Sequence, residues 1–241
     1  MRPTRARKVT VAGAAFAFFV AGAAVTGAGI ANARGTTDTD GDVKSTAIAL
    51  AGEVSLAPIV AEWPDAYSVA GSKSEPLYTE RITFSRDADL FVLRIEVIAQ
   101  GDTALGTQRG AVRVAGDGTI TWVAGCTKDA AACENDPALR GFLTTAALIG
   151  LERTGRLPET GTARALHGTP VVCVDDDAVH PDTAPSIAGL APCFSIATGA
   201  LLGHWSAASA AFVGPTLAPG FAETSERDEA LFGELFGGVL P

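Results

Sequence analysis

The sequence predicts an α+β domain, because strand-like and helix-like spacings of apolar residues occupy separate parts of the chain. Apolar and polar residues alternate from residue 67 to Trp122, a helical pattern follows over residues 137–153, and alternation returns between residues 163 and 206. A second helical pattern spans residues 226–237. Groups of strands separated by single helices are typical of antiparallel sheets with helices packed on them.

The first expected element is a short helix within residues 47–63, which are mostly apolar. Pro64 disfavours helical backbone in the residue before it and so ends this helix near Trp63. Strands follow, in which Ile82 and Phe84 lie two residues apart and therefore on one face. These residues predict a strand with an apolar side turned toward a core.

The next strand has the clearest two-sided pattern. Its apolar face consists of Phe91, Leu93, Ile95 and Val97. Arg94 and Glu96 lie on the opposite face. One dry face and one wet face are typical of an antiparallel meander that covers a core on one side.

A hairpin is predicted at Gly116-Asp117-Gly118. Val112 and Val114 precede this turn, and Ile120 and Trp122 follow it. Alternation on both sides of an Asp-Gly pair is a strong short-range hairpin signal.

The central helix is predicted from its ends as well as from its spacing. Asn135 or Asp136 can cap it, and Pro137 suits its first turn. Its apolar face consists of Leu139, Phe142, Leu143, Ala146 and Ile149. Gly155 can end the helix, because glycine readily adopts the left-handed conformation found after helix termini.

The remaining elements follow the same rules. Strands are expected at Ala163–Val174, Cys193–Ala197 and Leu201–Ser206, and residues 207–216 could add one more. The terminal helix over residues 226–237 begins near Ser225 and Asp228, which resemble a capping box.

The amino-terminal residues have the three parts of a secretory signal peptide. Four basic residues precede an uncharged apolar run over residues 9–30, and the small-x-small site Ala31-Asn32-Ala33 follows. An uncleaved membrane anchor is the alternative, but the many Ala and Gly residues of the run favour cleavage. We therefore expect a signal peptide over residues 1–33, a flexible segment over residues 34–46 and a single domain over residues 47–241, secreted or held in the cell envelope with no stable membrane span after cleavage.

The net charge of the cleaved chain argues against two classes of binding partner. Cleavage would leave 14 basic against 27 acidic residues, a formal charge of −13. Nucleic-acid binding is not expected from such a chain, because phosphate contacts need clustered Lys and Arg. Electrostatic attraction to an anionic lipid surface is not expected either. Scarce Lys with abundant Ala and Gly suggests a GC-rich bacterial genome, such as that of an actinobacterium.

Four cysteines follow the expected cleavage site, and an even number in an exported chain predicts disulfides. Three pairings are possible. The local one, Cys126–Cys133 with Cys173–Cys193, closes two short loops and is preferred. The spacings lack the C-x-x-C pairs of zinc and thioredoxin-type sites.

Few residues suggest chemistry. Asp175-Asp176-Asp177, His180 and Asp182 could hold a metal ion, but their spacing matches no known ligand loop, and a solvated acidic loop explains them as well. His167, His180 and His204 could each join a catalytic triad, which assembles in space rather than in sequence. The chain has no G-x-S-x-G or H-E-x-x-H motif. No catalytic residue, metal or cofactor is assigned.

One short motif is interpreted as a loop. Leu157-Pro158-Glu159-Thr160-Gly161 spells LPxTG, the motif that sortases cut. Sorting also needs a following hydrophobic span and a basic tail, whereas 80 residues of strand-rich sequence follow here. We expect a Pro-Gly loop between a helix and a strand.

Residues 167–205 carry a family resemblance. The segment contains His167-Gly168-Thr169-Pro170-Val171-Val172-Cys173, then Pro192-Cys193-Phe194, then Thr198-Gly199-Ala200-Leu201-Leu202. This succession is similar to exported bacterial proteins of the lipoprotein-carrier type, which include the periplasmic lipoprotein carrier and the lipid-carrying lipoproteins of mycobacteria. The resemblance implies a curved antiparallel sheet, a half-barrel with helices packed on its concave face, around an apolar cavity for acyl chains. Unlike the mycobacterial members, this chain lacks a lipidated Cys after the signal.

The resemblance predicts an exported, non-enzymatic cell-envelope protein that binds lipid or another hydrophobic ligand. The candidate lining residues are Ile82, Phe84, Phe91, Leu93, Ile95, Trp122, Phe142 and Phe194. An ordinary core would use the same residues. Two alternatives remain open, a secreted hydrolase with a histidine-containing site and a structural module whose sheet edge pairs with another protein.

Overall fold

The computed structural model of the chain describes most residues beyond the amino-terminal segment. The described ranges are 52–74, 76–125, 137–179, 189–214 and 216–237, with side chains described in all of them except 137–143. Contacts divide the chain into two units, Met1–Ser45 and Thr46–Pro241, and all of the described residues belong to the second. The predicted signal peptide, the segment 34–46, and Cys126 and Cys133 lie outside the described residues.

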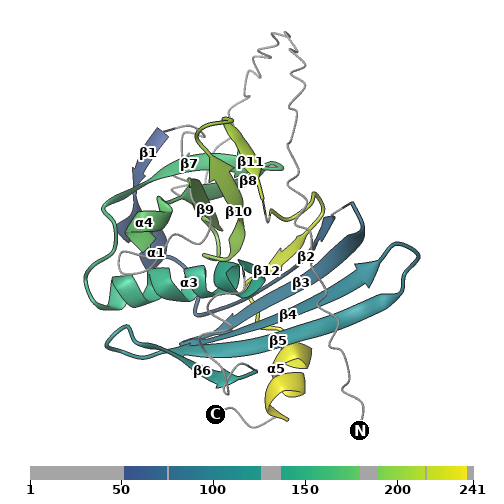
Figure 1. Ribbon diagram of the computed structural model, residues 1–241. Helices are drawn as coiled ribbons and strands as arrows, with labels where there is room; N and C mark the ends of the chain where they lie inside the picture. Colours follow the sequence, from purple (N-terminus) through teal and green to yellow (C-terminus); the bar gives the residue numbers. More distant parts are fainter. Residues whose placement is uncertain (1–51, 75, 126–136, 180–188, 215, 238–241) are drawn as a thin grey trace, which may run out of the picture. The chain divides into compact units, whose positions relative to one another are not determined.

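The described strands form two six-stranded antiparallel sheets (Figure 1). The N-terminal sheet has the order β12-β2-β3-β4-β5-β6 and consists of β2 (Ala66–Ser74), β3 (Tyr78–Asp87), β4 (Leu90–Ala99), β5 (Ala104–Val114), β6 (Ile120–Ala124) and β12 (Ala222–Thr224). The C-terminal sheet has the order β1-β7-β8-β9-β10-β11 and consists of β1 (Gly52–Ser55), β7 (Thr160–Leu166), β8 (Thr169–Cys173), β9 (Leu190–Ser195), β10 (Leu201–Ser206) and β11 (Ala211–Val213). Each sheet is a meander of five consecutive strands, extended by one short strand from the other end of the domain.

The α+β class is confirmed, but the strands are divided between two sheets, and a half-barrel is not confirmed. The division arises where the chain leaves α3 (Pro137–Arg153). The next strand, β7, pairs with β1 rather than with β6, and Ala163 lies opposite Gly52. The helix α3 contacts strands of both sheets, and Figure 1 shows it between them.

The short helix expected within residues 47–63 is present, and a strand that was not expected precedes it. The helix α1 covers only Leu56–Ala61, and residues 52–55 form β1 instead. The backbone N–H of Leu56 donates to the carbonyl of Glu159 at 3.1 Å, just where β1 pairs with β7. This pairing with a distant strand overrides the apolar spacing along the chain.

The other helices are close to their predicted positions. α3 spans the predicted residues 137–153, and Gly155 behind it has a φ of +67°. A short helix, α4 (Asp176–Val179), follows β8 and was not predicted. The terminal helix, α5, covers Glu229–Phe236 within the predicted 226–237.

The predicted apolar face of β4 is confirmed, but the expectation that the opposite face of the sheet is wet is wrong where α5 packs on it. Phe91, Leu93 and Ile95 lie in the main core, which also contains residues of the C-terminal sheet, α1 and α3. Leu90 and Val92, on the other face of β4, form a second apolar cluster with α5. The N-terminal sheet is therefore covered on both faces, and Figure 1 shows α5 beside β4 and β5.

Two hairpins differ in how well the sequence predicts their turns. The predicted Asp-Gly turn joins β5 to β6, with Gly118 at a φ of +79°. Residues Ala163–Val174 also contain a turn, because β7 and β8 are joined at His167-Gly168, with φ of +51° and +89°. The prediction that strand structure continues through His167, within Ala163–Val174, is therefore wrong. Two successive residues with positive φ are typical of the tight turns that close two-residue hairpins.

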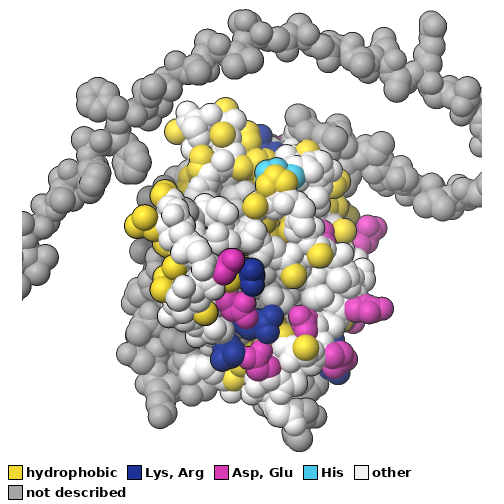
Figure 2. Space-filling view, turned by 90° about the vertical axis from the view of Figure 1, so that its right-hand side faces the viewer, with side chains coloured by type: hydrophobic (Ala, Val, Ile, Leu, Met, Phe, Trp, Pro, Cys, Tyr) yellow, Lys and Arg dark blue, Asp and Glu magenta, His cyan; other side chains and the backbone are white. Residues whose placement is uncertain are grey.

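Charges of both signs are mixed on the surface shown in Figure 2, where Lys and Arg side chains lie among Asp and Glu. The described ion pairs include Lys73 with Glu80 at 3.1 Å and Arg94 with Glu96 at 3.5 Å. Within the described residues, no helix is long and apolar enough to cross a membrane.

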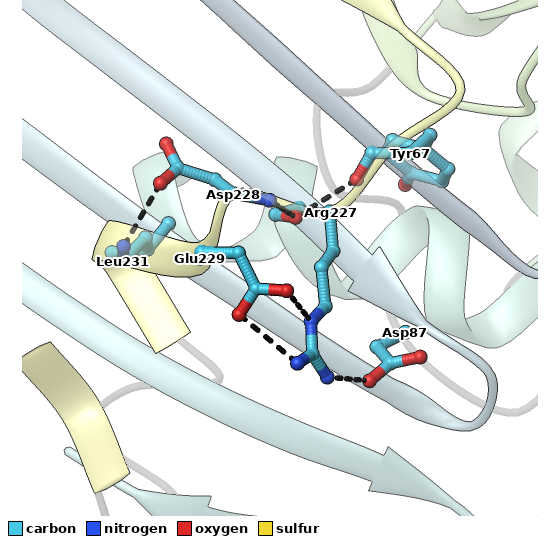
Figure 3. Close-up of polar contacts among 7 residues, drawn as sticks. Tyr67, Asp87, Arg227, Asp228, Glu229 and Leu231 are labelled. Carbon is cyan, nitrogen blue, oxygen red and sulfur yellow. Dashed lines mark hydrogen bonds and ion pairs between the residues drawn. The ribbon is translucent and has the colours of Figure 1, made fainter. Parts of the chain in front are cut away.

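Polar contacts hold the start of α5 against the N-terminal sheet (Figure 3). The Asp228 carboxylate caps the helix by accepting a hydrogen bond from the backbone N–H of Leu231 at 2.9 Å. The backbone N–H of Asp228 donates to Oγ of Ser85, and that hydroxyl donates to the carbonyl of Tyr67, both at 2.8 Å. Asp228 is thus the N-cap itself, and not the N3 residue of a capping box that begins at Ser225.

Candidate functional site

The apolar residues predicted to line a cavity lie in the packed core. Ile82, Phe91, Leu93, Ile95 and Phe194 are buried there, and Phe84 and Trp122 are partly buried against it. The side chain of Phe142 lies outside the described part. Strand register brings Ile82 opposite Ile95 and Phe84 opposite Leu93. This packing is what a core requires, and a role in ligand binding stays a prediction.

Close contacts between indole rings and glycines show how tightly this core is packed. A Cβ atom added to Gly110 would lie 2.7 Å from the Trp122 ring, and one added to Gly199 would lie 2.5 Å from the Trp63 ring. Trp63 also packs against Phe194, with ring centroids 6.2 Å apart. Only glycine allows such an approach of an aromatic ring to the backbone.

One predicted disulfide is present. Cys173 and Cys193 are bonded, and they are register partners on the neighbouring strands β8 and β9. The pairing confirms one half of the preferred connectivity, and it is consistent with an oxidising environment. The other half, Cys126 with Cys133, lies outside the described residues.

A groove of about 530 Å³ lies beside this disulfide on the C-terminal sheet. Its lining residues are Thr162, Arg164, Cys173, Asp175, Asp176, Asp177, Ala178, Gly189, Leu190, Ala191, Trp205 and Ala207. The volume falls within the range of small-molecule sites in proteins. Most of its walls are strand residues and the α4 segment that directly follows β8.

Strand register explains why these residues meet. Thr162 lies opposite Cys173, Cys173 lies opposite Cys193, and Ala191 lies opposite Trp205. Directly opposed residues of an antiparallel sheet project to the same face, and Arg164, two residues after Thr162, shares that face. The groove therefore lies on the face that carries the disulfide, which is opposite the face of Phe194, although Cys173 and Cys193 are buried in the same core cluster.

Arg164 and Trp205 form an aromatic–cation pair in the groove. The guanidinium carbon of Arg164 is 3.6 Å from the centroid of the Trp205 ring, and Phe212 meets the same ring edge-on at 5.2 Å. Burial lowers the pKa of Arg164 from its usual value, because desolvation disfavours the charged form. Nε of Arg164 is buried and has no hydrogen-bond partner among the described residues.

The negatively charged side chains of the groove lie in α4 and in Asp175 just before it. Asp175 and Asp177 are exposed, whereas Asp176 is buried. The carbonyl of Asp175 accepts backbone hydrogen bonds from Ala178 at 3.0 Å and Val179 at 3.2 Å, which fix the turn that carries the three carboxyl groups. Within the described ranges, no three His, Cys, Asp or Glu side chains are grouped so that they could hold a metal ion.

The two candidate catalytic histidines that the structure describes, His167 and His204, do not line the groove. His167 lies in the β7–β8 turn, and its Nε2 is 3.1 Å from the carbonyl oxygen of Leu217. His204 is buried on β10, where its backbone N–H donates to Oγ1 of Thr216 at 3.1 Å. His180 lies outside the described residues.

Sequence reasoning found the acidic wall of the groove but missed Arg164 and Trp205. The alternation of β7 and of β10 assigns each residue to a face of its own strand. Which faces coincide depends on the pairing of β7, β8, β9 and β10, and no local signal reports it. The two cysteines were the available clue, since a bond between them fixes the register of β8 against β9.

No family model, no curated protein and no solved structure matches this chain. The arrangement of the residues is therefore the basis on which a function is proposed, and the resemblance to lipoprotein carriers stays a hypothesis.

Proposed function

We propose that this chain is an exported, non-enzymatic ligand-binding protein and that the groove on the C-terminal sheet is its ligand site. One observation carries the proposal: a cavity of about 530 Å³ that brings a stacked Arg164–Trp205 pair and an aspartate-bearing turn to one face of a disulfide-bonded sheet. Export is proposed from the amino-terminal leader of basic, apolar and small residues.

The walls of the groove suit recognition of a small polar molecule. A few fixed polar groups among apolar surface give orientation and specificity in most ligand sites. Here Leu190, Ala191 and the Trp205 ring provide apolar contact, and Arg164 and the aspartates provide charge. Stacking on Trp205 restricts the guanidinium before a ligand arrives, so less conformational entropy is lost on binding.

The disulfide supports the same proposal by fixing two walls relative to each other. Cys173 ends β8, directly before the Asp175–Ala178 turn, and Cys193 lies two residues after Ala191. A covalent bond between them holds the acidic turn at a constant distance from β9. Sites on rigid strands hold their geometry better than sites on loops.

A panel of compounds from several chemical classes tests binding. The purified disulfide-bonded chain is mixed separately with amino acids, sugars, dicarboxylates, polyamines and lauric acid, and the shift in unfolding temperature is recorded. We expect a polar class to raise the unfolding temperature of the wild type and to lose this effect in Arg164→Gln. Arg81→Gln is the matched control, because Arg81 is an exposed strand arginine of the other sheet.

The result distinguishes ligand binding in the groove from binding of a hydrophobic ligand in the core. Stabilisation by lauric acid alone, unchanged in Arg164→Gln, would refute the groove and support the hydrophobic-ligand hypothesis with its lining residues in the core. Detection of the unprocessed chain inside cells, with free thiols, would refute export.

A further inference from the structure

The charges around the groove define a ligand class. Asp175 and Asp177 bring two exposed carboxyl groups to one wall, and Arg164 brings one guanidinium to another. The two exposed carboxylates attract a positive group at the mouth of the groove. A purely anionic ligand would meet more repulsion than attraction here.

Arg164 requires the complementary group. Its Nε–H is buried and unpartnered within the described residues, although a buried donor normally has an acceptor. The ring of Trp205 lies against the guanidinium at 3.6 Å, but a ring face does not replace a hydrogen-bond acceptor for Nε–H in the guanidinium plane. Surrounding atoms close off this nitrogen, so a ligand would pair with the rest of the partly exposed guanidinium in the groove, and a carboxylate matches a guanidinium best.

Resting on the function proposed above, we infer that the groove binds a free amino acid with a cationic side chain. The ligand carboxylate pairs with Arg164, and its ammonium groups lie near Asp175 and Asp177. The two positive charges and one negative charge of such a ligand complement a site with excess carboxylate. The volume of the groove leaves room for a molecule of this size together with water.

Isothermal titration of the full disulfide-bonded chain with four probes tests this class. L-lysine carries both kinds of charge, putrescine carries only ammonium groups, succinate carries only carboxylates, and glucose is neutral. We expect the affinity order L-lysine, putrescine, and then succinate and glucose without measurable binding.

Two sets of variants test which side of the groove binds the ligand carboxylate and which side binds its ammonium groups. Arg164→Gln should weaken L-lysine by about tenfold, as expected for one charge-assisted hydrogen bond, and leave putrescine nearly unchanged. The double variant Asp175→Asn/Asp177→Asn should weaken both cations. Asp102→Asn is its control, since Asp102 is exposed in the β4–β5 turn and its φ of +62° suits asparagine.

Different results overturn different claims. Glucose or succinate binding that Arg164→Gln abolishes would overturn the ligand class and leave the groove as a binding site. Failure of all four probes would overturn the class as well. L-lysine binding that neither variant changes would overturn both the class and the groove.

Discussion

The two sheets share a topology but differ in what covers the face turned away from the core. The N-terminal sheet has long strands, of 9 to 11 residues in β2 to β5, and α5 packs on its outer face. The strands β7 to β10 of the C-terminal sheet have only 5 to 7 residues, and their outer face carries the disulfide and the groove. A helix covers the outer face of the first sheet, whereas the second sheet combines buried residues such as Cys173 and Cys193 with the groove on the corresponding face.

In the N-terminal sheet, an acidic residue of α5 compensates two neighbouring positive charges. Arg94 and Arg109 are register partners on β4 and β5, so two positive charges lie side by side. Glu234 of α5 pairs with both, at 3.2 Å from Arg94. Around the groove, by contrast, the described contacts leave Nε of Arg164 without such an acceptor. Under the proposed function, the first sheet is a scaffold and the second carries the ligand site.

The largest expected effect tests whether the two sheets fold as one unit. Phe91→Ala and Phe194→Ala should each lower the free energy of unfolding by about 3–5 kcal/mol, because both side chains are fully buried in one core. Urea denaturation followed by circular dichroism and by tryptophan fluorescence should show one transition in each variant. Leu105→Ala, at an exposed position, is the control and should change stability by less than about 0.5 kcal/mol. Two separate transitions would show that the sheets are independent.

The second largest expected effect is the loss of stability on removal of the disulfide in the C-terminal sheet. Cys173→Ala/Cys193→Ala should lower stability by about 2–4 kcal/mol, because the bond restricts the unfolded chain. Amide hydrogen exchange should accelerate in β8 and β9 more than in β3 and β4, whose pairs are long and covered on both faces. Equal acceleration in both sheets would contradict the expectation that the disulfide stabilises the C-terminal sheet locally.

Sequence patterns within a short window correctly predicted those helices, strands and turns that depend on residues close together in the chain. The Asp117-Gly118 turn, the helix over 137–153 and the strand Leu201–Ser206 have the predicted positions. Each depends on turn chemistry, helix-end residues or apolar period within a short window. The same reasoning missed the turn at His167-Gly168, where a histidine takes the positive φ that Asn or Asp more often adopts.

Pairing between distant segments could not be predicted. The strands β1 and β12 have four and three residues, too few for a periodic signal, yet each extends a sheet built from the other end of the domain. The same limit applies to the site. The acidic residues 175–177 stood out by composition, whereas Arg164 and Trp205 became neighbours only through the order β7-β8-β9-β10.

The smallest expected effect is the acid sensitivity of the helix that closes the N-terminal sheet. Arg227 donates two hydrogen bonds to Glu229, at 2.7 and 3.0 Å, and also pairs with Asp87 (Figure 3). The hydrogen bonds from Arg227 lower the pKa of the Glu229 carboxyl below its usual range. A carboxyl whose pKa is lower in the folded state stabilises that state above its unfolded pKa, and this contribution is lost as the pH falls through the folded value.

Acidification below about pH 4 should therefore loosen α5 before it affects the C-terminal sheet, and the effect should be small because both partners are exposed to solvent. A carbon-detected NMR titration of the Glu229 carboxyl measures it directly. Arg227→Gln should move the titration midpoint of Glu229 upward, toward that of an ordinary glutamate, whereas Arg81→Gln should leave it unchanged. An unchanged midpoint in Arg227→Gln would show that this ion pair does not hold the helix to the sheet in solution. The closure of the outer face would then rest on Leu231 and Phe232 packing against Leu90 and Val92.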